Sequence, residues 1–219
     1  MITVLMPSRG RERQAREAYE AFAATKRLPD TEMLAVLDWT EPSYAGLPVT
    51  HIGSHQSGLG MGPALNAGLS YTTADIIGFI GDDHRFRTDG WDEAIVAANA
   101  AMGGGIVYGN DLLRGEELPS QVFIDARIVR ALGWMALPGA HHLFLDDAWR
   151  ELGNRMGRLA YLPDVHIEHM HPTAGKAEWD ANYHRVNASA MYAHDAEFFH
   201  AWMRDGIEAD AERALAALR

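Results

Sequence analysis

The stretch Asp75-Ile-Ile-Gly-Phe-Ile-Gly-Asp-Asp-His84 decides the fold class of this chain of 219 residues. Asp75–Ile80 is the most hydrophobic strand expected in the sequence, and it leads directly into Gly81 and the adjacent carboxylates of Asp82 and Asp83. A short apolar run bounded by turn residues is typical of a strand that is buried on both faces, as in a parallel sheet.

Strands and helices alternate upstream of this segment. Strands are expected at Ile2–Met6, Glu32–Leu37 and Val49–Ile52, and helices at Arg11–Ala24 and Pro63–Tyr71. This spacing predicts an α/β fold with a Rossmann-like, mostly parallel central sheet flanked by helices. Ligands bind beyond the carboxyl ends of such strands. The polar or glycine-rich segments that follow these strands are expected to converge there: Pro7–Arg9, Asp38, Gly58–Gly62 and Asp82–Asp83.

The second half of the chain is less regular. Its expected strands are Ile106–Tyr108, Gln121–Ile124, Leu159–Leu162 and Val165–His169, and its expected helices are Trp91–Ala101, Arg127–Leu132, Asp146–Leu152 and most of the chain after Ala188. No repeat or low-complexity linker divides the sequence, so one domain is expected over residues 1–219. Phe198, Phe199 and Trp202 near the C-terminus either pack into the core, cover a site, or form a homodimer contact.

The composition excludes several classes of protein. A net charge of −11 argues against nucleic acid as a partner without eliminating it. Because the chain has no cysteine, a metal site must be built from Asp, Glu, His and backbone oxygens. Met1–Met6 is too short for a signal peptide, and no apolar stretch approaches the ~20 residues that span a bilayer. A cytoplasmic protein without a membrane span is therefore expected.

Asp82 and Asp83 are the first candidates for chemistry. Adjacent carboxylates at the end of an apolar strand repel each other and resist burial unless a cation lies beside them. One can bind Mg²⁺ or Mn²⁺ while the other orients a ribose or a nearby arginine, because neighbouring strand residues point to opposite faces. The alternative interpretation is a solvated turn.

Asp146 and Asp147 form a second acidic pair where a helix is expected to begin. One of the two carboxylates is explained equally well as a helix N-cap or as a general base that removes a proton from a hydroxyl.

Three histidines follow in Val165-His-Ile-Glu-His-Met-His-Pro172. His169 and His171 are two positions apart, so an extended chain presents both on one face. Neutral imidazoles bind divalent cations, although most of the 11 histidines of the chain must have structural or exposed positions.

Weaker signals surround the first strand and the glycine-rich segment. Arg9 and Arg11 suit phosphate oxygens, although both can also be ordinary helix-surface residues. Backbone N–H groups in Gly58–Gly62 are a possible phosphate or base site, but the spacing fits neither a P-loop nor a dinucleotide fingerprint. Asn110 and Asp111 either line an acceptor site or make a turn.

Four motifs, in this order, resemble the family 2 glycosyltransferases, which have the GT-A fold. They are Ile2-Thr-Val-Leu-Met-Pro-Ser-Arg-Gly-Arg11 followed by Asp38, Gly60-Met-Gly-Pro-Ala-Leu-Asn-Ala-Gly-Leu69, Ile76-Ile-Gly-Phe-Ile-Gly-Asp-Asp83, and Leu145-Asp-Asp-Ala-Trp-Arg150. The likeness spans residues 2–172, and the Gln-x-x-Arg-Trp motif of processive members is absent.

The resemblance implies a nucleotide-binding half over residues 1–84, an acceptor-binding half over 85–172 and a mainly helical extension over 173–219. It also implies site residues. Those that would bind the nucleotide-sugar are Pro7, Arg9, Arg11, Asp38, Gly62, Asn66 and Asp82. Asp83 would bind Mn²⁺ or Mg²⁺ together with His171 or else His169. Asp147 matches the catalytic base of the family's Glu-Asp motif, and Asp146 replaces the Glu, so either carboxylate can be the base.

The function implied is transfer of a sugar from a nucleotide-diphosphate sugar, with a UDP-sugar favoured, to the hydroxyl of an unknown acceptor. An Asp general base would give inversion at the anomeric carbon. The alternatives are a retaining GT-A enzyme, a nucleotidyltransferase and a catalytically inactive GT-A binding module.

Overall fold

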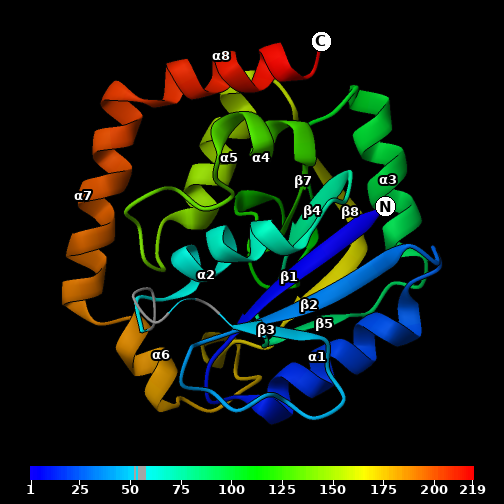
Figure 1. Cartoon of the computed structure of the whole chain (residues 1–219), viewed down its shortest axis with the longest axis vertical. Helices are drawn as coiled ribbons and strands as arrows, with labels where there is room; N and C mark the ends of the chain where they lie inside the picture. The colour runs from blue at the N-terminus through cyan, green and yellow to red at the C-terminus, as the bar shows by residue number, and fades with distance from the viewer. Residues whose placement is uncertain (52, 54–57) are drawn as a thin grey trace.

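A computed structural model of the chain describes residues 1–51, 53 and 58–219. Within this part of the chain one sheet of eight strands forms the centre of the molecule (Figure 1). The strands are β1 (Ile2–Ser8), β2 (Thr31–Leu37), β3 (Val49–His51), β4 (Ile76–Phe79), β5 (His84–Phe86), β6 (Ile106–Asn110), β7 (Val122–Asp125) and β8 (Leu159–His169). Their order across the sheet is β3-β2-β1-β4-β7-β6-β8-β5.

Helices cover both faces of this sheet (Figure 1). The helices are α1 (Glu12–Thr25), α2 (Met61–Gly68), α3 (Trp91–Met102), α4 (Ala126–Leu132), α5 (Leu145–Met156), α6 (Ala181–Val186), α7 (Ser189–Asp205) and α8 (Ile207–Ala217). Side chains of α1 and α3 pack with one set of strand residues, and those of α2, α4, α5, α7 and α8 pack with the other set.

The alternation of strand side chains explains the two cores. Along β1, Val4 and Met6 join the core beneath α1, whereas Leu5 joins the core beneath α2. Gly78 in β4 allows the ring of Phe123 to pack closely against the centre of the sheet, since a Cβ atom at position 78 would lie 2.7 Å from that ring. Burial on both faces is why β1 and β4 read as continuous apolar runs.

The predicted α/β fold with a mostly parallel sheet is confirmed, since four of the seven strand pairings are parallel. Two elements were not predicted. β5 has three residues and begins directly after the acidic pair, and α6 has six residues. Elements this short carry no measurable periodicity. Leu159–His169 is one strand instead of two extended segments, with a register shift opposite Gly109 and Asn110.

The remaining predictions concern the end of the third strand and the aromatic residues near the C-terminus. Ile52, the last residue of the third predicted strand, lies outside the described residues, as do residues 54–57. In the C-terminal segment Phe199 and Trp202 are buried in the core, whereas Phe198 is 40% exposed. Among the described residues, none of the helices combines the length and the apolar character needed to cross a membrane.

Strand direction brings the predicted site residues to one edge of the sheet. β1, β2 and β4 are parallel to one another. β6 is antiparallel to β7, which is antiparallel to β4, so β6 and its parallel partner β8 run in the direction of β4. The carboxyl ends of β1, β2, β4 and β8 therefore share an edge, and β5, antiparallel to β8, begins there.

Candidate active site

A pocket of about 290 Å³ opens at this edge of the sheet. Its walls come from the loop after β1, the ends of β4 and β8, the first turns of α2 and α5, and α6. The predicted site residues that line it are Pro7, Arg9, Arg11, Asp38, Asp82, Asp83, Asp146, His169 and His171. Gly62, Asn66 and Asp147 are not among its lining residues.

Asp82 is buried beneath the pocket and is held by the loop after β1. Ser8 Oγ donates a hydrogen bond to Asp82 Oδ2 at 2.7 Å, and Arg11 Nη1 donates to Oδ1 at 3.1 Å. Burial and the neighbouring charge of Asp83 raise the pKa of Asp82 to about 6, against the opposing effect of Arg11 and Ser8. Asp82 therefore orients Arg11.

Asp83 lies among imidazoles and a phenol. Its Oδ2 accepts a hydrogen bond from the Tyr183 hydroxyl at 2.7 Å and is 3.4 Å from His169 Nε2. Its Oδ1 is 3.2 Å from His84 Nδ1. Burial opposes the negative charge, but the neighbouring imidazoles of His169 and His84 hold the pKa of Asp83 well below its usual range. Its charge in turn raises the pKa of His169 against the effect of burial.

The spacing of Asp83 and His169 fits a divalent cation. An octahedral ion with bonds of about 2.1 Å keeps neighbouring ligand atoms about 3 Å apart, close to the separation of Asp83 Oδ2 and His169 Nε2. That separation is longer than the ~2.7–2.9 Å of a charge-assisted hydrogen bond. His169 Nδ1 is buried without a hydrogen-bond partner among the described residues. A carboxylate and an imidazole nitrogen form a suitable donor set for Mn²⁺ or Mg²⁺.

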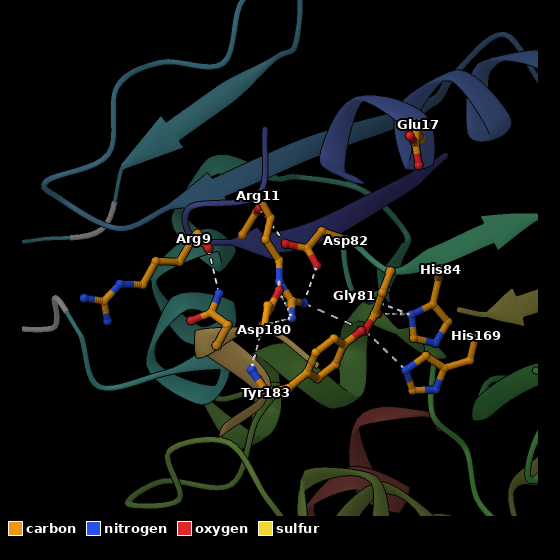
Figure 2. A network of polar contacts seen from close by, with 12 residues as sticks. Arg9, Arg11, Glu17, Gly81, Asp82, His84, His169, Asp180 and Tyr183 are labelled. Carbon is orange, nitrogen blue, oxygen red and sulfur yellow. Dashed lines mark hydrogen bonds and ion pairs between the residues drawn. The ribbon is translucent and has the colours of Figure 1, made fainter. Parts of the chain in front are cut away.

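His84 was not among the predicted ligands, yet its ligand atom lies within 4.8 Å of those of Asp83 and His169. The two imidazoles face each other as partners across β5 and β8, stacked at 4.3 Å with planes 17° apart (Figure 2). A metal binds in the plane of an imidazole ring, so two nearly parallel rings do not direct their lone pairs at one ion. His84 Nδ1 also accepts the Gly81 N–H at 3.1 Å. His84 therefore packs against His169 and supports it.

His171 lines the pocket, but among the described residues it is not part of the Asp83, His84 and His169 group whose ligand atoms lie within 4.8 Å of one another. Its ring lies 5.0 Å from that of His169, with an angle of 69° between the two planes. Its Nδ1 lies 2.7 Å from Thr173 Oγ1. Nδ1 also accepts the Thr173 N–H at 3.2 Å, so Nδ1 is the unprotonated nitrogen of the neutral ring and the proton lies on Nε2.

The second acidic pair lies in the first turn of α5 and is divided between two environments. Asp146 lines the pocket beside Trp149, and burial together with the charge of Asp147 raises the pKa of Asp146 to about 6. Asp147 instead accepts a hydrogen bond from Arg150 Nη2 at 2.9 Å on the helix surface. Neither side chain caps α5, which begins after Phe144 in the left-handed region at φ 61°.

The side chain of Asn66 and the backbone of Gly62 hold α2 against neighbouring loops. Asn66 Oδ1 accepts the N–H groups of Met135 and Ala136, and its Nδ2 donates to the carbonyl of Ala136. Gly62 donates its N–H to the carbonyl of His141 at 2.8 Å, and a Cβ atom there would lie 2.5 Å from the carbonyl of Ala140. Both residues support the wall of the pocket from behind.

Asp38, which was predicted to bind the nucleotide, is hydrogen-bonded to the glycine-rich segment. Both carboxylate oxygens of Asp38 accept the Gly58 N–H at 3.0 Å, and Arg9 Nε lies 3.3 Å from Oδ2. Asn110 and Asp111 make the turn that was their alternative interpretation. Asp111 Oδ1 accepts three successive backbone N–H groups, those of Leu113, Arg114 and Gly115.

Sequence reasoning missed the contribution of α6 to the pocket. Asn182, Tyr183 and Arg185 all line it. Arg11 donates from Nε and Nη2 to the two oxygens of Asp180, each at 2.8 Å, so that Arg11 lies between Asp82 and Asp180 (Figure 2). The only local signal was Asp180 as an N-cap three residues before Tyr183.

A second group of possible metal ligands lies outside the pocket and has a structural role. His141, His194 and Asp195 have ligand atoms within 4.8 Å of one another. The two rings are stacked at 4.1 Å and 20°, which again is unsuited to sharing an ion. The buried Asp195 carboxylate already accepts the N–H groups of residues 141, 142 and 143 and contacts His194 Nδ1. It therefore fixes the loop before α5 to α7.

Solved structures with the same architecture are found although the sequence matches no protein-family model and no curated protein. A mannosyltransferase from Pyrobaculum calidifontis, PcManGT, in complex with GDP-Man and Mn²⁺, superposes with a TM-score of 0.69 at 17% identity, over 99% of this chain and 72% of that one. Glucosyl-3-phosphoglycerate synthase from Mycobacterium tuberculosis, with Mn²⁺, UDP-glucose and phosphoglyceric acid, gives 0.63 at 15%, over 92% and 79%. S. aureus TarS in complex with UDP-GlcNAc gives 0.57 at 14%, over 92% and 71%.

These similarities establish the architecture. The chain has the GT-A fold, and the sequence-based expectation of that fold is confirmed.

Proposed function

We propose that the protein is a metal-dependent glycosyltransferase that moves a sugar from a nucleotide-diphosphate sugar to an acceptor hydroxyl. The observation that carries this proposal is the facing of Asp83 Oδ2 and His169 Nε2 at 3.4 Å, at the ligand-binding edge of a GT-A sheet. The Mn²⁺ and nucleotide-sugars named with the structural neighbours support it.

Asp83 and His169 would hold Mn²⁺ or Mg²⁺, and His171 lies beside them in the pocket. When bound, such an ion supplies positive charge that offsets the negative charge developing on the diphosphate leaving group. Arg11 adds a fixed positive charge beside it. Burial disfavours the guanidinium charge, but Asp180 and Asp82 raise the pKa of Arg11 above its usual value, so it stays ionised.

The donor would lie along the wall formed by the loop after β1. Pro7, Arg9 and Asp38 line the end of the pocket nearest β2, where we place the nucleoside. Arg185 of α6 approaches the same end and donates to the carbonyl of Gly58 at 3.3 Å. UDP-sugars are the first donors to test and GDP-sugars the second, since both nucleotides occur with the structural neighbours.

Asp146 is the general base in this proposal. It lines the pocket, and its pKa of about 6 leaves it mostly ionised at neutral pH yet basic enough to take a proton. As the acceptor oxygen bonds to the anomeric carbon, its proton passes to Asp146, and the bond from that carbon to the diphosphate oxygen breaks. Attack opposite the leaving group inverts the anomeric carbon. Asp147, the base implied by motif matching, is held by Arg150 outside the pocket lining.

Product analysis separates this function from its rivals. A retaining enzyme would release the same nucleoside diphosphate but keep the anomeric configuration, which NMR of the product reports. A nucleotidyltransferase would release pyrophosphate. A binding module would bind the nucleotide-sugar without consuming it.

The first experiment is thermal unfolding against a panel of nucleoside diphosphates and nucleotide-sugars, with and without Mn²⁺, on the wild type, Asp83→Ala and the control Asp205→Ala. Ligands that bind the folded state raise its stability by mass action. We expect a Mn²⁺-dependent shift with one nucleotide, kept in Asp205→Ala and lost in Asp83→Ala. Asp205 ends α7, and its side chain is 79% exposed. If no nucleotide shifts the wild type, the donor site is wrong.

A further inference from the structure

The segment after β8 places a phenol hydroxyl against the carboxylate that we assign to the metal. Tyr183 lies in α6, 100 positions from Asp83 in the chain, and its hydroxyl donates to Asp83 Oδ2 at 2.7 Å. The Tyr183 side chain is buried. A residue from the C-terminal extension thus reaches the centre of a site that is otherwise built from strand ends.

Arg11 fixes the start of α6. Two of its nitrogens form a fork on Asp180, and Asp180 Oδ1 also accepts the Tyr183 N–H at 2.9 Å. The third nitrogen, Nη1, donates to Asp82. One guanidinium therefore connects the acidic pair at the end of β4 to the first turn of α6 (Figure 2).

The ring of Tyr183 is held as well as its backbone. The Arg11 guanidinium lies 4.0 Å from the ring centroid, and His171 contacts the ring edge-on at 5.2 Å and 78°. The neighbouring Asn182 Nδ2 donates to the carbonyl of Arg9 at 2.6 Å. The hydroxyl is therefore directed at Asp83 by contacts on several sides, and it is not a freely rotating group.

The hydrogen bond is compatible with a cation on the same oxygen. A carboxylate oxygen offers two lone pairs. One lone pair of Asp83 Oδ2 accepts the Tyr183 hydroxyl, and the other is available toward His169 Nε2, 3.4 Å away. Hydrogen bonds of this kind orient ligating carboxylates and tune metal affinity.

Given the metal-dependent function proposed above, on which this inference rests, we propose that Tyr183 is a positioning residue for the metal-binding carboxylate of Asp83. α6 and the Arg11–Asp180 fork hold Tyr183 in place for this role. The C-terminal segment then completes the metal site and is more than a cover on the sheet.

Direct Mn²⁺ binding tests this role without measuring catalysis. EPR of free Mn²⁺ gives the dissociation constant for the wild type, Tyr183→Phe, Asp83→Ala and the matched control Tyr192→Phe, whose residue is 58% exposed on α7. Tyr183→Phe removes one oxygen and keeps the ring under Arg11. We expect Mn²⁺ affinity to fall by about 10–100-fold in Tyr183→Phe, as for other groups that orient metal ligands. It should be unchanged in Tyr192→Phe.

The outcomes separate this inference from the function beneath it. If the wild type binds no Mn²⁺, alone or with any nucleotide, the proposed function fails. If Asp83→Ala loses Mn²⁺ but Tyr183→Phe binds as the wild type does, only the role of Tyr183 is wrong. Tighter binding by Tyr183→Phe would also overturn it, because the hydroxyl would then compete with the ion.

Asp180→Asn provides a second variant if Tyr183→Phe does not fold. It leaves the hydroxyl in place and weakens the fork on Arg11 that holds α6. We expect a smaller loss of Mn²⁺ affinity in the same direction, and wild-type affinity in this variant would contradict the proposed support by α6.

Discussion

Two pairs of adjacent aspartates each contribute a carboxylate to the same pocket, and their second members have opposite surroundings. In both pairs burial and the neighbouring carboxylate raise the pKa of the first member, Asp82 or Asp146, to about 6. Asp83 lies beside imidazoles and a phenol inside the pocket, whereas Asp147 pairs with Arg150 on the surface of α5.

The difference follows from the backbone that carries each pair. Asp82 and Asp83 lie in the turn between β4 and β5, where both side chains reach the pocket and its cationic partners. Asp146 and Asp147 lie on a helix, where successive residues are about 100° apart, so one faces the pocket and the other solvent. The turn therefore brings both carboxylates to cationic partners, whereas the helix leaves a single carboxylate facing the pocket.

The largest effect that this comparison predicts is the loss of activity in Asp146→Asn. Loss of a general base typically costs about 10²–10⁴ in rate, so we expect kcat to fall in that range while Mn²⁺ and donor binding are unchanged. In the wild type kcat/KM should rise with pH up to about 6, because Asp146 must be ionised to accept a proton. Steady-state kinetics from pH 5 to 8 test both.

Asp147→Asn is the control for this prediction. If Asp147→Asn loses more activity than Asp146→Asn, the two residues have the reverse roles and the motif-based assignment of Asp147 is the better one.

Most of the fold was predictable because its strongest signals are local. Ile76–Ile80 and Ile2–Met6 are apolar runs closed by polar stops, and strand direction alone brings Asp38, Asp82 and Asp83 to one edge. β5 and α6 were not predictable, because three and six residues give no periodicity and only tertiary contacts stabilise them.

The site residues were predictable where they follow the ends of strands. They were not predictable where contacts between distant parts of the sequence bring them to the pocket. Asp83, His169 and Arg11 were named from motifs, and the structure brings all three to the pocket. Tyr183 was missed because nothing around it in the sequence indicates that Arg11 and Asp180 direct it at Asp83. Asn66 was assigned to the nucleotide from a motif position, and only the structure shows its amide bound to the Met135–Ala136 backbone.

A smaller effect is expected on stability as a function of pH. The folded protein keeps a proton on Asp146 up to about pH 6, whereas the ordinary pKa of the group is 3.8. Between these values the unfolded chain binds fewer protons, so the free energy of unfolding of the metal-free protein falls as pH rises. Asp146→Asn lacks this fall. Chemical denaturation should show Asp146→Asn gaining about 2 kcal/mol over the wild type between pH 4 and pH 7, from a pKa difference of roughly two.

A stability difference between Asp146→Asn and the wild type that does not change with pH would show that Asp146 is solvated in the folded protein. Asp82→Asn is a less suitable test, because that change also removes a partner of Arg11 and Ser8.

The smallest effect belongs to the other member of the second pair. Asp147 and Arg150 are 29% and 32% exposed, and Arg150 keeps Glu151 as a second partner at 3.2 Å. Ion pairs this open to solvent contribute about 0–1 kcal/mol, so Asp147→Asn should change the free energy of unfolding by less than about 1 kcal/mol. It should also lower the pKa of Asp146, because the charge of Asp147 is part of what raises it. The rising limb of the kcat/KM profile would then move to lower pH with little change in its plateau, whereas an unmoved limb would mean that the two carboxylates do not interact.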